Sequence, residues 1–212
     1  MRYETQTFKD LSKKDIKNNF PEFLIVHHTG GSDRNPLADS SNQSVFDVEN
    51  WHKSLNWEGI GYHFFIDKSG QVSLGRPEWH NGAHTKGYNM KSLGICLAGN
   101  FDITLPTAGQ VTSLRELLKE LSQKYNIDSS KIIPHRTHAN KTCYGKNLSD
   151  SWAKDLLLPV VKIQEGGTLC SYAVSEKEIQ SLGKVIEKQS ETINRQGSTI
   201  ELLTAIIKKI FK

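Results

Sequence analysis

Isoleucine recurs every seven residues near the end of the chain, and this repeat constrains the fold more than any other feature of the sequence. The repeat comprises Ile179, Ile186, Ile193, Ile200 and Ile207. A straight α-helix drifts by roughly 20° per heptad against such a repeat, so the strict spacing favours helices that supercoil around one another. We therefore predict a coiled-coil oligomerisation helix over residues 176–212, which joins copies of the chain through residues 179–210.

Two other interpretations of this segment stay open. A single amphipathic helix could lie on the rest of the protein, and the short basic end at residues 206–212 could contact a membrane surface. Gln189 and Gln196 occupy positions that face the predicted seam, three residues after an isoleucine. These two glutamines weaken an apolar seam and can fix its register or the number of helices that it joins. The sequence does not determine how many helices the coiled coil contains.

The residues before this helix alternate between short apolar runs and amphipathic helical patterns. Strands are predicted at residues 23–26, 62–66, 71–74 and 93–98, with a further short one at residues 132–133. Helices are predicted at residues 44–57, 107–125 and 148–160, and long loops at residues 32–43 and 77–91. This alternation predicts an α/β domain over residues 1–160, with a single central mixed β-sheet flanked by helices. Residues 161–175, which include Gly166 and Gly167, are predicted to be a linker.

Charge and cysteine content narrow the function classes. The 212 residues carry a formal net charge of +4, which is too small an excess to argue for a nucleic-acid partner. Cys96, Cys143 and Cys170 are an odd and low number, which fits synthesis in a reducing compartment better than a disulfide framework. The N-terminal residues lack the apolar core of a signal peptide, and we expect no transmembrane segment because no apolar run is long enough.

His27, His135 and Cys143 are the strongest candidates for a reactive site. His27 follows a predicted buried strand and precedes glycine-rich backbone, where a side chain can be both rigidly held and accessible to solvent. Two histidines and one cysteine are ligands that zinc accepts, and three protein ligands leave a fourth position open, as in catalytic zinc sites. From residue types and spacing alone, a zinc site and a scatter of surface histidines both agree with the sequence.

Six segments follow one another along the chain in an order that is typical of one enzyme family. They are Phe23–Thr29, Trp51–Lys53, Gly61–Phe64, Gly82–Asn89, Leu93–Gly99, and His135 followed by Lys141-Thr142-Cys143. Together they resemble the type 2 N-acetylmuramoyl-L-alanine amidases, which include small phage lysozymes with amidase activity and the animal peptidoglycan recognition proteins. The resemblance covers about residues 20–158, most of the chain before the predicted linker.

The resemblance implies both a metal site and a reaction. The family's zinc ligands fall on His27, His135 and Cys143, its catalytic tyrosine on Tyr62, and the catalytic lysine of the phage enzymes on Lys141. Members of the family hydrolyse the amide bond between N-acetylmuramic acid and L-alanine in peptidoglycan, with Zn²⁺ lowering the pKa of a bound water towards roughly 7. Lys141 makes the chain similar to the phage branch, and Cys143 argues against an intracellular recycling branch that uses Asp as its last ligand.

Other polar residues have a structural and a functional interpretation. His84 and Asn89, in a loop expected to face the cleft, are candidates for substrate binding, with a structural turn as the alternative. His28 alternates with His27 along the strand and is expected to pack on the opposite face. Packed positions are expected for His52, His63 and Cys96, surface positions for His80 and His138, and an exposed thiol for Cys170.

The resemblance to phage enzymes also implies a biological setting. We expect an endolysin that is made in the host bacterial cytoplasm, reaches the cell wall after a partner holin opens the membrane, and lyses the host. A coiled coil would present several catalytic domains to a polymeric wall, where multivalency raises the effective concentration. Two alternatives stay open: a peptidoglycan-binding module without catalysis, and a regulatory protein whose residues 1–22 help to bind and restrain an RNA polymerase, as in some phage amidases.

Overall fold

The computed structural model describes residues 18–32, 34–158, 160–165 and 168–173, with side chains in the first two ranges. The chain divides into two units, Met1–Leu157 and Leu158–Lys212. The predicted coiled coil at residues 176–212 and most of the N-terminal segment 1–22 lie outside the described residues, so both stay predictions. No helix among the described residues is long and apolar enough to cross a membrane.

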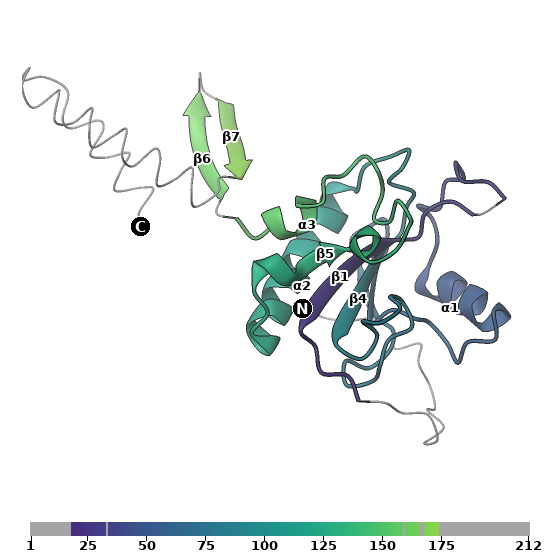
Figure 1. Ribbon diagram of the computed structural model, residues 1–212. Coiled ribbons are helices and arrows are strands. Elements are labelled where there is room, and N and C mark those ends of the chain that lie inside the picture. The colour runs from purple at the N-terminus through teal and green to yellow at the C-terminus, as the bar shows by residue number, and fades with distance from the viewer. Residues whose placement is uncertain (1–17, 33, 159, 166–167, 174–212) are drawn as a thin grey trace, which may run out of the picture. The chain divides into compact units, whose positions relative to one another are not determined.

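The first unit is built around a five-stranded sheet with the strand order β3-β2-β4-β1-β5 (Figure 1). Its strands are β1 (Phe23–His28), β2 (Phe64–Ile66), β3 (Val72–Leu74), β4 (Ser92–Leu97) and β5 (Ile132–Pro134). Strands β2, β4, β1 and β5 run parallel, and β3 pairs antiparallel with β2 at one edge. The predicted central mixed sheet is confirmed.

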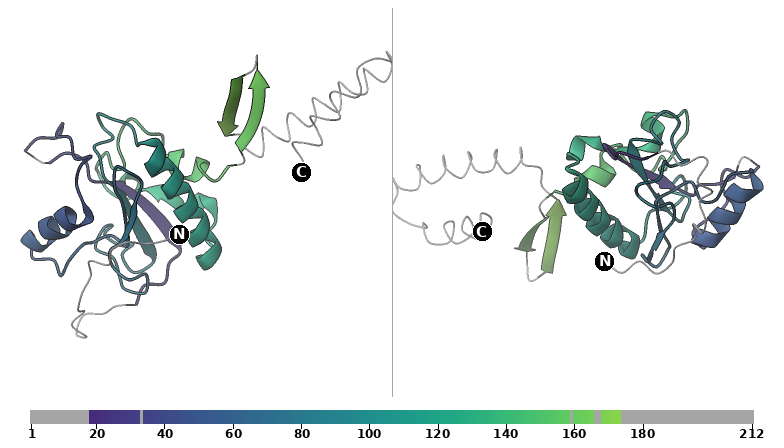
Figure 2. Two further views of the ribbon diagram at one scale, coloured as in Figure 1. Left: turned by 180° about the vertical axis from the view of Figure 1, so that it is seen from behind. Right: turned by 90° about the horizontal axis from the view of Figure 1, so that it is seen from below.

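Two helices cover opposite faces of this sheet (Figure 1, Figure 2). Helix α1 spans Val45–Ser54, and helix α2 spans Ala108–Tyr125. Each begins at a capping box, in which side chain and backbone satisfy two N–H groups that a helix start leaves without partners. Ser44 with Asp47 forms the first box, and Thr107 with Gln110 forms the second. Both helices could be predicted because a capping box is a local sequence pattern.

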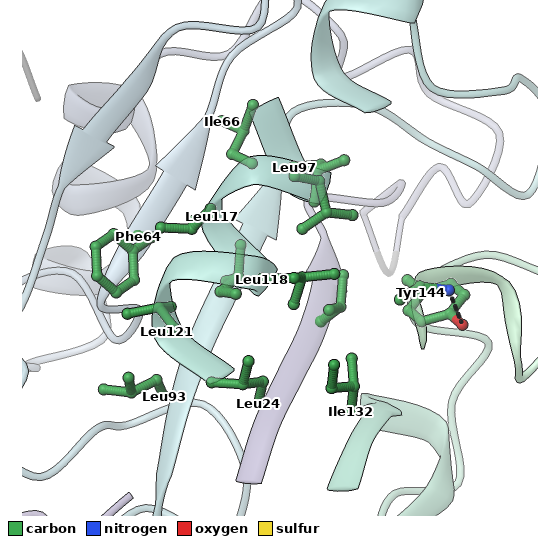
Figure 3. Close-up of a cluster of buried hydrophobic side chains, with 14 of the residues drawn as sticks. Leu24, Phe64, Ile66, Leu93, Leu97, Leu117, Leu118, Leu121, Ile132 and Tyr144 are labelled. Carbon is green, nitrogen blue, oxygen red and sulfur yellow. Dashed lines mark hydrogen bonds between the residues drawn. The ribbon is translucent and has the colours of Figure 1, made fainter. Parts of the chain in front are cut away.

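The apolar stripe of α2 packs on one face of the sheet and forms the main core (Figure 3). Leu114, Leu117, Leu118 and Leu121 of this helix are at most 1% exposed. Burying one leucine side chain stabilises a fold by about 1.5–3 kcal/mol, so this stripe is the main attachment of α2 to the sheet. Tyr144 has its ring in the same cluster, which anchors the loop around residue 143 to the core.

Side-chain alternation along β1 sends neighbouring histidines to opposite faces. Leu24 and Val26 belong to the core under α2, so with a period of two residues His28 lies on that side and His27 on the side of α1. Cys96, the register partner of His27 on β4, belongs to the smaller apolar cluster beneath α1. The expected burial of Cys96 is confirmed, and the two histidines have different surroundings, as their spacing predicted.

The last helix and one earlier strand are shorter than predicted. The helix expected over residues 148–160 is reduced to α3 at Trp152–Asp155. The Tyr144 hydroxyl donates to the backbone carbonyls of Ser149 and Asp150, which holds these residues in a turn instead of a helix. The strand expected at residues 62–66 begins only at Phe64. Two short 3-10 helices, η1 (Ser129–Lys131) and η2 (His135–Thr137), flank β5.

His80 was expected at the surface, and this expectation is wrong. The residue is 1% exposed, whereas His138 is exposed as expected. Residues near the N-terminus cover it: Asn18 forms an isolated β-bridge with His80, and the Asn19 side chain donates to the carbonyl of Glu78 at 3.1 Å. A contact between residues so far apart in the chain leaves no local pattern from which burial can be predicted.

The described residues of the second unit form an antiparallel hairpin. Strand β6 (Val160–Glu165) pairs with β7 (Thr168–Ala173), and Gly166 and Gly167 lie between them in the sequence. A glycine pair between two strand patterns is a recognised hairpin signal. The linker predicted at residues 161–175 therefore overlaps two strands, β6 and β7, that were not predicted from the sequence.

Candidate metal centre

Two of the predicted ligands come from the carboxyl ends of neighbouring parallel strands. His27 lies near the end of β1, and His135 directly follows β5. Because Val26 pairs with Pro134, the residues that follow them lie side by side at one edge of the sheet. The two imidazole ring centroids are 4.5 Å apart. Ligand sites of open α/β sheets concentrate at the carboxyl edge, where loops from several strands meet.

The third predicted ligand, Cys143, reaches this edge on the loop that follows η2. Its Sγ lies 3.7 Å from Nδ1 of His27 and accepts the backbone N–H of His28 at 3.4 Å. One ligand atom from each of His27, His135 and Cys143 lies within 4.8 Å of the others. The structure thus brings the three sequence-predicted ligands into one group, called the metal cluster below.

The donor set and its spacing fit a zinc ion. In a tetrahedral zinc site with usual bond lengths, a nitrogen and a sulfur ligand lie about 3.6 Å apart. The separation between His27 Nδ1 and Cys143 Sγ is 3.7 Å, close to that value. Three protein ligands leave one position for water or substrate, which is the arrangement of catalytic zinc sites.

Burial keeps both imidazoles of the metal cluster neutral, which is the form that binds a metal. The pKa of His27 lies well below its usual value because of burial and, next, because a protonated His27 ring would be repelled by a proton on the neighbouring His84 or His135 ring. Burial, together with the nearby Lys141 ammonium, lowers the pKa of His135 to about 4. Burial raises the pKa of the Cys143 thiol to about 12, while the N–H of His28 and the charge of Lys141 act in the opposite direction. A cation bound between them would stabilise the thiolate.

Tyr62 and Lys141, the predicted catalytic residues, flank the metal cluster in different ways. The ring centroid of Tyr62 lies 5.0 Å from that of His27, and its hydroxyl is hydrogen-bonded to the Cys96 thiol. Burial raises the pKa of the Tyr62 hydroxyl well above its usual value, and the thiols of Cys96 and Cys143 raise it further. Tyr62 is therefore protonated at neutral pH. Lys141 is exposed, and its charge acts on both His135 and Cys143.

The loop at residues 77–91 places His84 against the metal cluster. Nδ1 of His84 lies 3.1 Å from Nε2 of His27. The Asn89 side-chain oxygen accepts the backbone N–H groups of His84 and Thr85 at 2.9 and 2.8 Å. Asn89 therefore stabilises the turn at residues 84–89, which is the structural role that the sequence left open for it. A substrate contact by His84 or Asn89 stays a prediction.

Comparison with known proteins decides the family. The sequence profile described as N-acetylmuramoyl-L-alanine amidase matches residues 17–146, more than half of the chain. The chain belongs to the N-acetylmuramoyl-L-alanine amidase family. It is 39% identical to the endolysin of Enterobacteria phage T3 over 125 residues, which cover 56% of this chain and 81% of that protein. It is 33% identical to peptidoglycan-recognition protein SC2 of Drosophila melanogaster over 142 residues, or 66% of this chain and 77% of that protein.

A solved structure in the same family supports the fold. The N-acetylmuramoyl-L-alanine amidase LysC from Clostridium intestinale URNW superposes with a TM-score of 0.60 at 31% sequence identity, covering 71% of this chain and 95% of that chain. The expected resemblance to phage amidases and peptidoglycan recognition proteins is thereby confirmed.

Two residues that hold the loop around Cys143 in place were not predicted from the sequence. The Arg136 guanidinium donates to the carbonyls of Gly145 and Leu148 at 2.8 and 2.7 Å. The Asp102 carboxylate accepts the Thr142 hydroxyl and the Lys146 backbone N–H, both at 2.7 Å. Asp102 lies some 40 residues before its partners in the chain, and Arg136 sits among other polar residues, so neither carries a local signal.

Three further histidines of the amidase-family domain accept backbone N–H groups through Nδ1. His28 accepts from Phe101 at 3.0 Å, His52 from Gly61 at 3.1 Å, and His63 from Gly94 at 3.0 Å. An imidazole accepts a hydrogen bond only in its neutral form. Burial lowers the pKa of each of the three to about 4. The packed positions expected for His52 and His63 are confirmed, and the backbone hydrogen bonds explain them.

Because these three imidazoles are neutral in the folded protein, we expect acid to destabilise the fold. An unfolded histidine has a pKa of roughly 6.5, and the folded pKa of His63 is about 4. Below pH of about 6.5 the unfolded chain therefore binds protons that the folded chain does not, so the free energy of unfolding falls as the pH drops towards about 4. Each such histidine contributes a slope of up to about 1.4 kcal/mol per pH unit.

The His63→Asn variant isolates one of these contributions. The asparagine oxygen can take the place of Nδ1 and accept the Gly94 N–H, but it does not titrate. Urea unfolding of metal-free wild type and variant across this pH range should give a shallower slope for the variant, whatever its stability at neutral pH. Equal slopes would contradict the assignment of His63.

Proposed function

We propose that this chain is a zinc-dependent N-acetylmuramoyl-L-alanine amidase that hydrolyses the amide bond between N-acetylmuramic acid and L-alanine in peptidoglycan. The observation that carries the proposal is the metal cluster of His27, His135 and Cys143, whose ligand atoms lie within 4.8 Å of one another. Membership of the family supports the reaction, and similarity to the endolysins of phages T3 and T7 supports a role in lysis of a bacterial host.

Each side chain near the metal cluster has a chemical role in this reaction. His27, His135 and Cys143 would hold the ion, which when bound polarises a carbonyl oxygen and lowers the pKa of a water molecule. Tyr62, kept protonated by burial, can orient the reacting water or relay its proton. The Lys141 ammonium offers positive charge to the amide oxygen as it becomes negative in the tetrahedral state. Tyr62 and Lys141 therefore act on the rate, while the three ligands determine metal binding.

The purified protein and purified peptidoglycan suffice to test the proposal. Newly released L-alanine amino groups report amide hydrolysis, and elemental analysis reports zinc. We expect about one zinc per chain and continued release of alanine amino groups. Zinc binding and wall binding without release would reject catalysis and favour a peptidoglycan-binding module.

We also propose that the chain is a phage endolysin that is made in the host bacterial cytoplasm and reaches the cell wall after a holin opens the membrane. The endolysins of phages T3 and T7, at 39% and 38% identity, support this setting. Cys96 and Cys143 are free thiols, which agrees with synthesis in a reducing compartment.

We also propose that residues 179–210 join several copies of the chain, on the strength of the isoleucine heptads. Replacing both Ile186 and Ile193 by Asp should convert the oligomer into single chains, because an unpaired carboxylate in an apolar seam costs several kcal/mol. Sedimentation analysis measures the change. Ser198→Asp is the matched control, since this residue falls on the outer face of the same heptads and should leave the oligomer intact. A wild type that sediments as a single chain would contradict the proposal.

A further inference from the structure

We infer that His84 is a positioning residue of the metal cluster, which holds the His27 ring in its ligand orientation by accepting a hydrogen bond from Nε2–H. This role differs from the substrate contact expected from sequence. It rests on the metal site of the proposed function, and it concerns how that site binds its ion and not the reaction that follows.

The two ring nitrogens of His27 face different partners. Nδ1 lies 3.7 Å from Sγ of Cys143, while Nε2 lies 3.1 Å from Nδ1 of His84. A metal takes the lone pair of one imidazole nitrogen, so the other nitrogen carries the hydrogen and needs an acceptor. The His27 and His84 rings cross at 88°, with centroids 5.0 Å apart. With the ion on the side of Cys143, the N–H of His27 is directed at His84.

Neighbouring groups favour the neutral tautomer of His84 that carries its hydrogen on Nε2 and accepts a hydrogen bond at Nδ1. Its Nε2 lies 3.5 Å from the Ser92 hydroxyl oxygen, and that hydroxyl donates its own hydrogen to the Tyr88 carbonyl at 2.7 Å. The Ser92 oxygen is thus left to accept from Nε2–H of His84. The Thr85 hydroxyl, 3.1 Å from Nδ1 of His84, is a second donor to that nitrogen, but a hydroxyl can rotate to another acceptor.

The His84 ring occupies a slot that exists only because two glycines line it. A Cβ at Gly82 would lie 2.4 Å from the ring, and a Cβ at Gly94 on β4 would lie 2.6 Å from it. Both distances are far inside van der Waals contact, so a side chain at either position would displace the ring. Asn89 fixes the backbone of the same loop through two N–H groups. A partner held this rigidly can fix the orientation of a ligand ring.

The inference is tested with variants that differ in the acceptor at the position of Nδ1. His84→Phe keeps a ring and removes the acceptor, whereas His84→Asn places an amide oxygen where Nδ1 was. Outer partners of zinc-bound histidines typically contribute 10- to 100-fold to metal affinity, so we expect a loss of about that size in His84→Phe. His84→Asn should remain near wild type. Zinc affinity is measured by competition with a chelator on the full chain.

Two controls separate this role from a general effect on the fold. Thr85→Val removes the other donor near Nδ1 and should leave zinc affinity near wild type. Thermal unfolding of the metal-free variants reports whether each is folded. If His84→Phe does not fold, His84→Gln replaces it, because the longer amide reaches the position of Nε2 and leaves His27 without its acceptor, with the same expected loss.

A folded His84→Phe variant with wild-type zinc affinity would overturn the inference. If that variant instead shows a raised KM for peptidoglycan with unchanged zinc affinity, His84 is a substrate contact and the positioning role is equally rejected. Zinc affinity is read without turnover. A wild type that binds zinc but releases no alanine amino groups would therefore reject the proposed reaction alone, whereas a wild type that binds no zinc would reject both.

Discussion

The Cys143→Ser variant is expected to lose zinc binding and amide hydrolysis together. Cys143 supplies the sulfur of the metal cluster, 3.7 Å from Nδ1 of His27. A thiolate is a strong zinc ligand, whereas a serine hydroxyl keeps its proton at neutral pH and binds zinc weakly. Since an outer partner of a ligand already contributes 10- to 100-fold to affinity, loss of the ligand itself should weaken zinc binding by more than about 100-fold.

The fold should survive this substitution, so the two losses can be assigned to the ligand. A serine oxygen can still accept the His28 N–H, which Sγ accepts at 3.4 Å. The Tyr144 ring keeps the loop anchored in the core, and Arg136 continues to bind its carbonyls. Zinc per chain, release of alanine amino groups and thermal unfolding of the metal-free protein, measured on the same samples, give the three readouts.

Cys96 offers the matched control for this experiment. It is the register partner of His27 and is fully buried, yet it lies outside the metal cluster. Cys96→Ser makes the same chemical change one strand away and should keep its zinc. Zinc retained by Cys143→Ser, or lost by Cys96→Ser, would contradict the assignment of the ligands.

The three candidate ligands could be named from sequence mainly because of the resemblance to one enzyme family. His27 ends a buried apolar run ahead of two glycines, and His135 and Cys143 belong to a segment that resembles that family. Their meeting point depends on β1 pairing with β5, a contact between distant residues that no local pattern states. The sheet and the two long helices followed from periodicity and capping, which act over a few residues.

What could not be predicted depends on contacts between distant residues. His80 is buried by residues near the N-terminus, and the last helix is shortened by hydrogen bonds from Tyr144. His84 shows the same limit at the site itself. Its loop suggested a substrate contact or a turn, whereas its ring lies against His27, 57 residues earlier in the chain. Residue type identified the polar groups of the site, and tertiary contacts determine which of them act on one another.

The Tyr62→Phe variant should keep its zinc and lose most of its rate. The substitution removes only the hydroxyl, and Tyr62 is not a member of the metal cluster. The phenylalanine ring can keep the contacts that the Tyr62 ring makes with His27 and with the apolar residues beneath α1. Proton transfer by a positioned side chain contributes about 10²- to 10⁴-fold to a rate, so we expect kcat to fall by a factor in that range.

Initial rates of alanine amino-group release at low and high peptidoglycan concentration separate kcat from KM, with zinc content measured on the same protein. Tyr125→Phe is the control, because it removes a tyrosine hydroxyl on α2 that donates to Glu78 at 2.8 Å and takes no part in the metal cluster. Its rate should equal that of wild type.

A Tyr62→Phe variant with the wild-type rate would exclude the hydroxyl from the reaction. A variant that loses both zinc and rate would show that Tyr62 supports the ligands. Only loss of rate with zinc retained agrees with a hydroxyl that acts on the reacting water.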